Sequence, residues 1–135
     1  MKHLLLTTIA AVVLVGCAKP PPPDISIHKA VSEENVGAIK QHLAAGTDVN
    51  AKDDSLGWTP LHYTAASGNR QITKLLISKG ANVNAINSNN DTPLDIAAFI
   101  FGIETTKQRS NLTQTADLLR KHDAKTGEEL KAEGK

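Results

Sequence analysis

The 135-residue sequence has few cysteine and aromatic residues and almost no net charge. Its single cysteine excludes an internal disulfide, and its aromatic residues are limited to one tryptophan, one tyrosine and two phenylalanines. The formal net charge is only +1, so neither nucleic-acid binding nor a polybasic membrane contact is expected. Stability must therefore come from close packing of aliphatic and small side chains.

Catalytic and metal-binding patterns are also missing from the sequence. No two histidines lie four residues apart, and the histidines have no cysteine partner at metal-binding spacing. There is no glycine-rich phosphate loop after a strand and no Gly-x-Ser-x-Gly motif. The sequence therefore predicts a protein that is not an enzyme and that needs neither a metal nor a cofactor.

The longest apolar run, Leu4 to Val15, contains 15 − 4 + 1 = 12 residues and is too short to span a bilayer as a mature helix. We interpret residues 1–16 as a secretory signal peptide. The ending Leu-Val-Gly-Cys resembles the lipobox of bacterial lipoproteins, which implies that Cys17 is lipidated and becomes the first mature residue. The alternatives are an uncleaved signal anchor and an ordinary signal peptide with an incidental cysteine.

The lipoprotein interpretation also predicts location. Ala18 stands where some bacteria use aspartate to retain lipoproteins at the inner membrane, so we expect a periplasm-facing protein of the outer membrane. Residues 17–24 contain the run Pro20 to Pro23, which favours an extended polyproline II stalk rising about 3.1 Å per residue. A ligand for a proline-recognising module is the other interpretation of this run.

A repeat of 92 − 59 = 33 residues organises the rest of the chain: Thr59-Pro60-Leu61-His62 returns as Thr92-Pro93-Leu94-Asp95, and both copies continue into paired alanines. A unit of this length cannot bury its apolar face alone and must stack on its neighbours. Threonine suits the N-cap position and proline the first helical position, so each copy predicts the start of a helix.

These residues resemble the ankyrin repeat, together with Gly80, Ala81, Asn82, Val83 and Asn84 in the second unit and Gly46 to Ala51 in the first. The resemblance implies an all-α solenoid over residues 25–127, in which about three helix-turn-helix units (25–56, 57–89 and 90–127) are joined by β-hairpin loops. Gly46 and Gly80 suit the left-handed position after a helix. Asp123 takes that place in the third unit, and Asn90 replaces the hairpin glycine Gly57.

The two ends of the domain depart from the pattern. The first unit lacks the Thr-Pro-Leu-His motif, and we expect its helices at Ile27 to Ser32 and Val36 to Ala44. After the domain, residues 128–135 form a charged tail, and the whole segment from Gly127 onward is expected to be a frayed helix or a tail.

The third unit holds an insertion. From Pro-Leu to Leu-Leu the spacing is 75 − 61 = 14 residues in the second unit and 118 − 94 = 24 in the third, so ten residues are inserted within 99–115. The simplest structure lengthens the first helix of this unit and adds a loop. Within Phe99 to Ile103, Phe99, Ile100 and Ile103 are expected to cap the open end of the solenoid, or Phe101 and its neighbours stay exposed to a partner.

The ankyrin resemblance implies a protein-protein interaction module, because partners of that family meet the hairpin tips and the exposed face of the first helices. Here the candidate contact residues are Asp53, Asp54, Leu56, Trp58, Tyr63, Ser67, Ile86, Asn87 and Asn89, with Trp58 and Tyr63 as the preferred anchors. Packing between hairpin and helix is the other explanation for those two aromatic residues. We expect a monomer that binds an unidentified protein and is held at the membrane by lipid on Cys17. A structural or protective envelope scaffold without a discrete partner is the alternative.

Overall fold

A computed structural model of the protein describes residues 19–99 and 105–135. These residues form seven helices and no strand. The helices are α1 (Ile27–Ser32), α2 (Val36–Ala45), α3 (Pro60–Ser67), α4 (Arg70–Ser78), α5 (Pro93–Phe99), α6 (Thr106–Lys121) and α7 (Gly127–Ala132). Within this part of the chain, none of the helices has the length and apolar character needed to cross a membrane.

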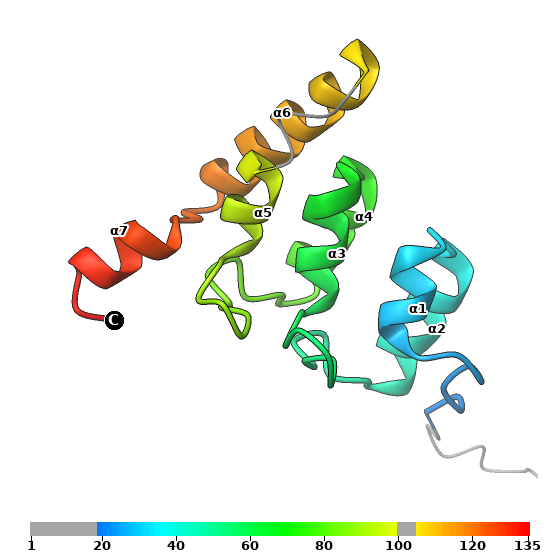
Figure 1. Cartoon of the computed structure of the whole chain (residues 1–135). Helices are drawn as coiled ribbons and strands as arrows, with labels where there is room; N and C mark the ends of the chain where they lie inside the picture. The colour runs from blue at the N-terminus through cyan, green and yellow to red at the C-terminus, as the bar shows by residue number, and fades with distance from the viewer. Residues whose placement is uncertain (1–18, 100–104) are drawn as a thin grey trace, which may run out of the picture.

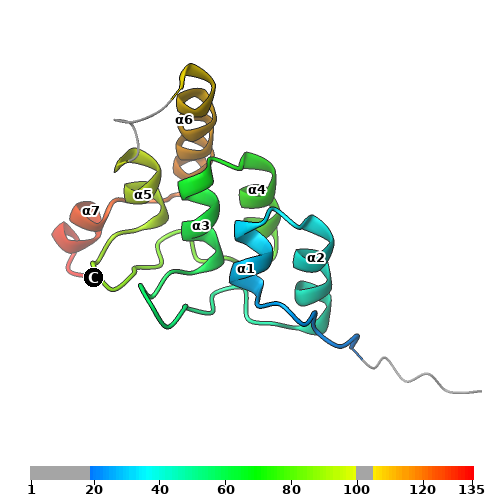
Figure 2. The ribbon, with the colours of Figure 1, turned by 45° about the vertical axis from the view of Figure 1, so that its right-hand side comes forward.

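The helices stack as three antiparallel pairs, α1 with α2, α3 with α4, and α5 with α6 (Figures 1 and 2). The first helices of the pairs form an inner layer and the second helices an outer layer. Loops connect the pairs on one side of the stack. This arrangement confirms the predicted all-helical solenoid of three units and leaves α7 beside the third unit at the C-terminal end (Figure 1).

The connecting loops fold back as hairpin-like turns, although the described residues form no strands. The loop between α2 and α3 is closed by the backbone bond from Asp53 N to Trp58 O (2.9 Å), and the next loop by Asn87 N to Asp91 O (3.0 Å). The two turns also touch each other, since Ser88 N donates to Leu56 O at 3.0 Å. A Cβ on Gly57 would lie 2.8 Å from Ser88 Oγ, so glycine permits this close approach.

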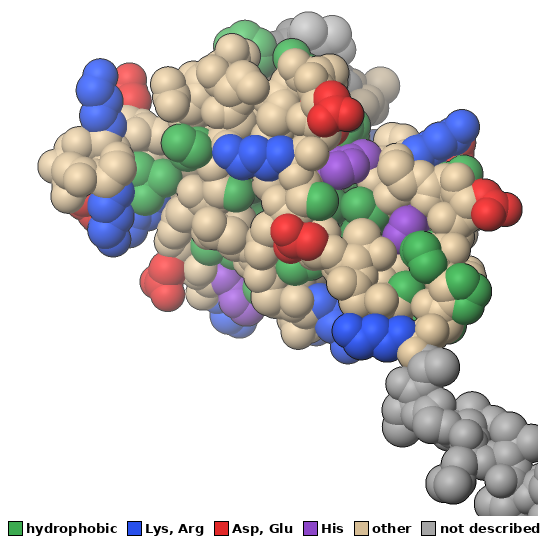
Figure 3. Space-filling view, turned by 90° about the horizontal axis from the view of Figure 1, so that it is seen from below, with side chains coloured by type: hydrophobic (Ala, Val, Ile, Leu, Met, Phe, Trp, Pro, Cys, Tyr) green, Lys and Arg blue, Asp and Glu red, His purple; other side chains and the backbone are tan. Residues whose placement is uncertain are grey.

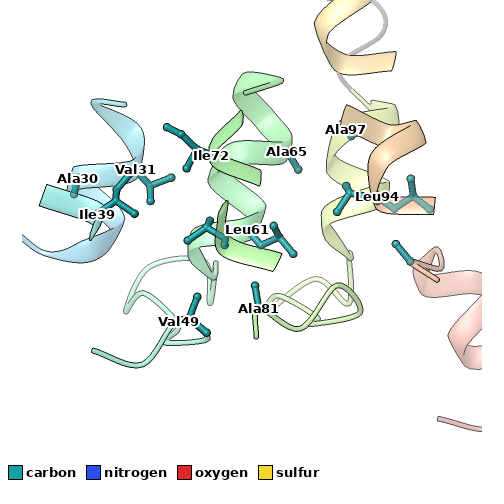
Figure 4. Packing of buried hydrophobic residues seen from close by; sticks show 13 residues of the cluster. Ala30, Val31, Ile39, Val49, Leu61, Ala65, Ile72, Ala81, Leu94 and Ala97 are labelled. Carbon is teal, nitrogen blue, oxygen red and sulfur yellow. The ribbon is translucent and has the colours of Figure 1, made fainter. Parts of the chain in front are cut away.

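The core is one continuous cluster that runs through all three units (Figure 4). Leu61 and Ala65 of α3 and Leu76 of α4 are fully buried between the neighbouring units. The alanines keep the helices close together, while the larger aliphatic side chains fill the space between layers. Each unit therefore depends on the units beside it for burial of its apolar face.

The helix ends follow the sequence prediction. Left-handed φ angles occur after the second helix of each unit, at Gly46 (80°), Gly80 (88°) and Asp123 (62°). The loop between α2 and α3 is the second hairpin and the loop between α4 and α5 the third, numbered after the units that they precede. Asn90 adopts φ 65° in the third hairpin, matching Gly57 at 65° in the second. Asparagine and aspartate tolerate this conformation better than most residues, which explains why both turns survive the loss of glycine.

Paired bonds from asparagine side chains connect successive units. Asn50 Oδ1 accepts from Asn82 N (2.7 Å) and its Nδ2 donates to Gly80 O (3.2 Å). One unit later, Asn84 Oδ1 accepts from Lys125 N (2.7 Å) and its Nδ2 donates to Asp123 O (3.2 Å). The repetition of both bonds fixes the same spacing at the two junctions.

The insertion lengthens the second helix of the third unit, so the prediction of a surface loop was wrong from Thr106 onward. The predicted lengthening of the first helix falls on residues 100–104, which lie outside the described residues. Helix α6 has 16 residues against 9 in α4. The additional 16 − 9 = 7 residues extend α6 at its N-terminus. There Leu112 is buried, and a Cβ on Gly68 would come within 3.1 Å of Leu112 N, because α6 packs directly over the α3–α4 turn.

Phe99 does not cap the solenoid, because its side chain is 90% exposed. The reason is its position on α5: Leu94 and Ala97 face the core, and the helical period turns Phe99 away from them. The other residues of the proposed cap, Ile100 and Ile103, lie outside the described residues, as does Phe101.

The segment from Gly127 forms helix α7, and its first turn is firmly held. Thr126 is its N-cap: Glu129 N donates to Thr126 Oγ1 (3.2 Å), and Thr126 N donates to a carboxylate oxygen of Glu129 (2.6 Å). Arg120 of α6 also pairs with Glu129 at 3.4 Å, and Lys125 pairs with Glu133. Because α7 begins with the same threonine cap as α3 and α5, it resembles the first helix of a repeat unit.

Residues 19–25 lie against the first unit. Gln41 of α2 donates from Nε2 to Pro21 O (3.3 Å), and His42 Nε2 donates to Ile25 O (2.7 Å). The Lys19 side chain lies beside Gly46 at the end of α2. Lys19 and Pro21 therefore contact α2 of the outer layer, while residues 19–22 remain exposed.

Candidate protein-binding surface

The second hairpin is organised around the carboxylate of Asp53. Oδ1 accepts hydrogen bonds from the backbone N–H groups of Ser55 (3.0 Å) and Leu56 (2.8 Å) and from the Ser55 hydroxyl (3.1 Å). Oδ2 accepts from the Tyr63 hydroxyl at 2.6 Å. These bonds hold the tip of the hairpin in one shape and connect it to α3.

The same bonds shift the pKa values of both partners. Burial raises the pKa of Asp53, but hydrogen bonds from Tyr63, the Leu56 backbone and Ser55 outweigh it and hold the pKa well below its ordinary value. The bond to the Asp53 carboxylate, followed by burial, raises the pKa of Tyr63 to about 12. Near neutral pH the pair is therefore a charged acceptor and a neutral donor.

Trp58 is half-buried between hairpin and helix. Its ring packs edge-to-face on Tyr63 with centroids 5.1 Å apart and lies 6.0 Å from the imidazole of His62. Tyr63 also contacts His28 of α1, with ring centroids 5.9 Å apart. The aromatic side chains thus form one group with restricted rotamers, whose exposed edges need little ordering when a partner binds.

A groove of about 590 Å³ opens beside this group, between the two hairpins and α5. We call it the concave groove. Its apolar wall consists of Leu56 (49% exposed), Trp58, Ile96, Ala98 and Phe99 (90% exposed). Its polar wall is formed by Asn87, Asn89, Asp91 and Asp95.

Two further hollows flank the concave groove. One, of about 540 Å³, lies between the first and second units and is lined by Ser26, His28, Lys29, Ser32, Lys52, Asp53, Asp54 and Tyr63. The other, of about 780 Å³, lies between the third hairpin and α7 and contains Ile86 and Leu130. Seen from the hairpin side, acidic, basic and hydrophobic side chains are interspersed over this part of the surface (Figure 3).

Apart from Ser67, the contact residues predicted from the sequence lie in the concave groove and in both of the flanking hollows. Leu56, Trp58, Asn87 and Asn89 line the concave groove, Asp53, Asp54 and Tyr63 line the first hollow, and Ile86 lines the hollow beside α7. Ser67 is exposed at the C-terminal end of α3 and lines none of them. Cys17, the predicted lipidation site, lies outside the described residues.

Asn87 and Tyr63 have clear structural roles. Asn87 is only 5% exposed, and its Oδ1 accepts from the backbone N–H groups of Asn89 (2.8 Å) and Asp91 (2.9 Å). Tyr63 is held by Asp53 through its hydroxyl. Of the two preferred anchors, Trp58 is therefore the one that lines the groove, with Tyr63 supporting it from behind.

Sequence reasoning did not select Ile96 or Ala98 as contact residues, and it left open whether the segment Phe99 to Ile103 caps the solenoid or meets a partner. The signal was present in the spacing: Phe99 follows Ile96 by three residues, which places both on one face of a helix, away from buried Leu94 and Ala97. For Phe99, the exposed side chain agrees with the second of these interpretations.

A family model described as ankyrin repeats (3 copies) matches residues 27–107. The chain belongs to the ankyrin repeat family. Ankyrin repeats are typical protein-protein interaction modules and are generally not catalytic. The residues that the structure describes contain no group of three or more His, Cys, Asp or Glu side chains that could hold a metal ion.

Curated proteins share similarity with the ankyrin repeats of this chain. The 2-5A-dependent ribonuclease of Mus musculus is 42% identical over 74 residues, covering 55% of this chain and 10% of the relative. A transient receptor potential cation channel subfamily A member 1 homolog of Caenorhabditis elegans is 46% identical over 78 residues (56% and 6%). Protein phosphatase 1 regulatory subunit 27 of Homo sapiens is 37% identical over 71 residues (53% and 46%). The chain spans less than half the length of each of these relatives.

Proposed function

We propose that this ankyrin repeat domain binds one protein partner through the concave groove. The observation that carries the proposal is the combination of strongly exposed Leu56 and Phe99 with the half-buried indole of Trp58 on a single concave surface. Large apolar side chains that remain exposed around a groove are typical of protein contact sites. The carboxylates of Asp91 and Asp95 on the opposite wall favour a partner segment that places cationic or N–H groups beside its apolar residues.

The groove is also supported rigidly enough to recognise a partner. Its hairpin wall is held by the Asp53 network and by the Ser88–Leu56 bond, and its aromatic wall by the Trp58–Tyr63 contact. A surface that keeps its shape in the free protein loses little conformational entropy on association. Trp58, Leu56 and Phe99 are the residues that we expect to contribute most to binding.

Replacement of Leu56 and Phe99 by serine tests this proposal. Both side chains are largely exposed, so the fold should survive, while capture of the partner by cross-linking in cells should fall at least tenfold, as expected for residues worth about 1.4 kcal/mol or more in an interface. Ile86→Ser is the matched control, because Ile86 is 40% exposed and lies outside the groove.

Mass spectrometry of the cross-linked material then separates recognition from a scaffold role. One dominant partner that is lost in the double variant and kept in Ile86→Ser supports the groove. A diffuse set of neighbours that is unchanged in the double variant counts against it and favours an envelope scaffold without a discrete partner.

We further propose that the domain is held in the bacterial cell envelope by lipid on Cys17, facing the periplasm and sorted to the outer membrane. The support is the lipobox-like ending of residues 14–17 and the presence of Ala18 after the cysteine. Metabolic labelling with a fatty acid should mark the wild-type chain and leave Cys17→Ser unlabelled. Equal labelling of the two chains, or none in either, would contradict the anchor.

A further inference from the structure

The near-zero net charge of this chain conceals an uneven distribution between its two helical layers. Five cationic side chains lie along the outer layer: Lys40 on α2, Arg70 and Lys74 on α4, Lys79 at its C-cap, and Lys121 at the end of α6. Among the described residues, none of the five forms an ion pair. All five are exposed.

The cations are neighbours in space and not only in sequence. Lys40 and Lys79 line one shallow groove between α2 and α4, together with Leu43, Ala44 and Leu75. Arg70, Lys74 and Lys121 line a second groove between α4 and α6, with His122, Gln114 and Leu118. Asp117 is the one carboxylate among the residues that line these two grooves. We call this surface the basic outer face.

The N-terminal connection leaves the domain on the same side. Residues 19–21 adjoin α2, where Pro21 O accepts from Gln41 Nε2 and the Lys19 side chain lies beside Gly46. Cys17 precedes Lys19 by 19 − 17 = 2 residues, which span at most about 7 Å when fully extended. A lipid on Cys17 would therefore hold the outer layer next to the bilayer surface.

We propose that the basic outer face rests on anionic phospholipid headgroups, so that the concave groove on the inner layer is turned toward the periplasm. This inference rests on the proposed lipid anchor. Each lysine or arginine near an anionic bilayer contributes roughly 1 kcal/mol, or about a fivefold change in binding, so the cations together orient a domain that the lipid has already brought to the surface. Leu43 and Leu75, half-buried in the α2–α4 groove, add apolar contact at the interface.

The test measures which face approaches the membrane. The lipidated full chain is reconstituted into vesicles of phosphatidylcholine with or without phosphatidylglycerol, with a fluorophore on an introduced cysteine and an energy acceptor on lipid headgroups. Gln114→Cys reports on the outer face and Ala98→Cys on the concave groove. The Gln114 label should transfer energy more efficiently than the Ala98 label, and only in vesicles that contain phosphatidylglycerol.

Substitution of the cations supplies the decisive comparison. Glutamine at Lys40, Lys74 and Lys121 should weaken the contact about 100-fold, at about fivefold per cation, and remove the difference between the labels. High salt should have a similar effect because it screens the attraction. Glutamine at Lys52, Lys131 and Lys135 changes the net charge equally at exposed sites away from the outer face and should leave the difference unchanged.

Failure of the anchor can be distinguished from failure of this inference. A Cys17→Ser chain with an N-terminal histidine tag, bound to nickel-chelating lipid, allows the same label comparison without acylation. Equal transfer from both labels, or a difference that persists after the outer-face lysines are replaced, would overturn the proposal. It would also be overturned if the outer face cross-linked to an acidic protein in cells while showing no preference for phosphatidylglycerol.

Discussion

At the scale of single residues, the repeat position that His62 holds in the second unit is held by Asp95 in the third. The difference matches the hydrogen-bonding group that the following element presents to each side chain. His62 Nδ1 accepts from Thr59 N (3.1 Å) and Nε2 donates to the carbonyl of Asp91 in the third hairpin (3.1 Å). Asp95 Oδ2 accepts from Thr92 N (2.8 Å) and also from the N–H of Gly127 in α7 (2.7 Å). A donor is needed where the next element presents a carbonyl, and an acceptor where it presents an N–H.

His62 should make stability fall as the pH drops below about 6.5. Burial lowers its pKa from the ordinary value of 6.5, with the Asp91 bond opposing in part, so the unfolded chain takes up a proton before the folded one. The contribution of neutral His62 to the free energy of unfolding is therefore fully present above pH 6.5. It is lost as the pH falls toward the lower pKa of the folded state, by up to about 1.4 kcal/mol per pH unit. Urea unfolding at a series of pH values measures this slope.

His62→Gln is the variant that isolates this titration. Glutamine can accept from Thr59 N and donate to Asp91 O but carries no titrating group, so the slope between pH 6.5 and the folded pKa of His62 should flatten. His122→Gln changes an exposed histidine and should keep the wild-type slope. A slope that persists in His62→Gln would show that another group causes it.

At the scale of elements, α7 is held mainly through its first turn. None of its residues is buried. The bond from Gly127 N to Asp95 and the pair Arg120–Glu129 hold its first turn, and the pair Lys125–Glu133 holds its C-cap. A Cβ on Gly127 would lie 2.4 Å from the carbonyl oxygen of Asn90. Glycine at this position lets the start of the helix approach the third hairpin.

Gly127→Ala should therefore displace α7 from the third unit. Overpacking against a backbone carbonyl costs about 1–3 kcal/mol, which outweighs the helix propensity that alanine gains. The urea midpoint should decrease, whereas Glu128→Ala, an exposed change in the same turn, should leave it nearly constant. An unchanged or higher midpoint for Gly127→Ala would mean that α7 does not rest on Asn90.

The sequence predicted elements best where a local signal and the repeat agreed. The Thr-Pro-Leu motifs located the starts of α3 and α5, and the expected first-unit helices differ from the observed ones by one residue, Ala45. The loop expected within the insertion was misassigned because residues 106–111 have no apolar period, and their place in α6 is decided by packing near Gly68. The Thr126–Glu129 capping box, in contrast, was readable from the sequence and was missed.

The candidate site was harder to predict than the helices, because it depends on side chains from different units. The exposed position of Leu56 on a hairpin was expected, but the groove needs Phe99 of α5 opposite it. Composition could not reveal the basic outer face either. Lys40, Lys74 and Lys121 come from three helices and become neighbours only when the units stack.

At the scale of the whole molecule, contacts connect mainly adjacent units, so local stability should depend on position in the stack. The second unit has a neighbour on both sides, and Leu61 and Leu76 are fully buried there. The first unit and α7 each have one neighbour. In such a solenoid, opening begins at the ends.

Hydrogen exchange should therefore be slowest in α3 and α4. Amides of α7 should exchange first, followed by those of α1 and α2, because these elements can open without disturbing the centre. Mass spectrometry of peptides from the exchanging protein can resolve this order. Uniform protection over all helices would instead indicate that the domain unfolds as one indivisible unit.

The identical asparagine bonds at the two junctions mean that the protein could be lengthened by tandem duplication. Asn50 engages the second unit through the same pair of bonds that Asn84 uses toward the residues leading into α7. A duplicated segment 57–89, of 89 − 57 + 1 = 33 residues, would find the same hydrogen-bonding groups at the junctions on both of its sides. One such genetic event would extend the binding surface without redesign of the rest of the protein.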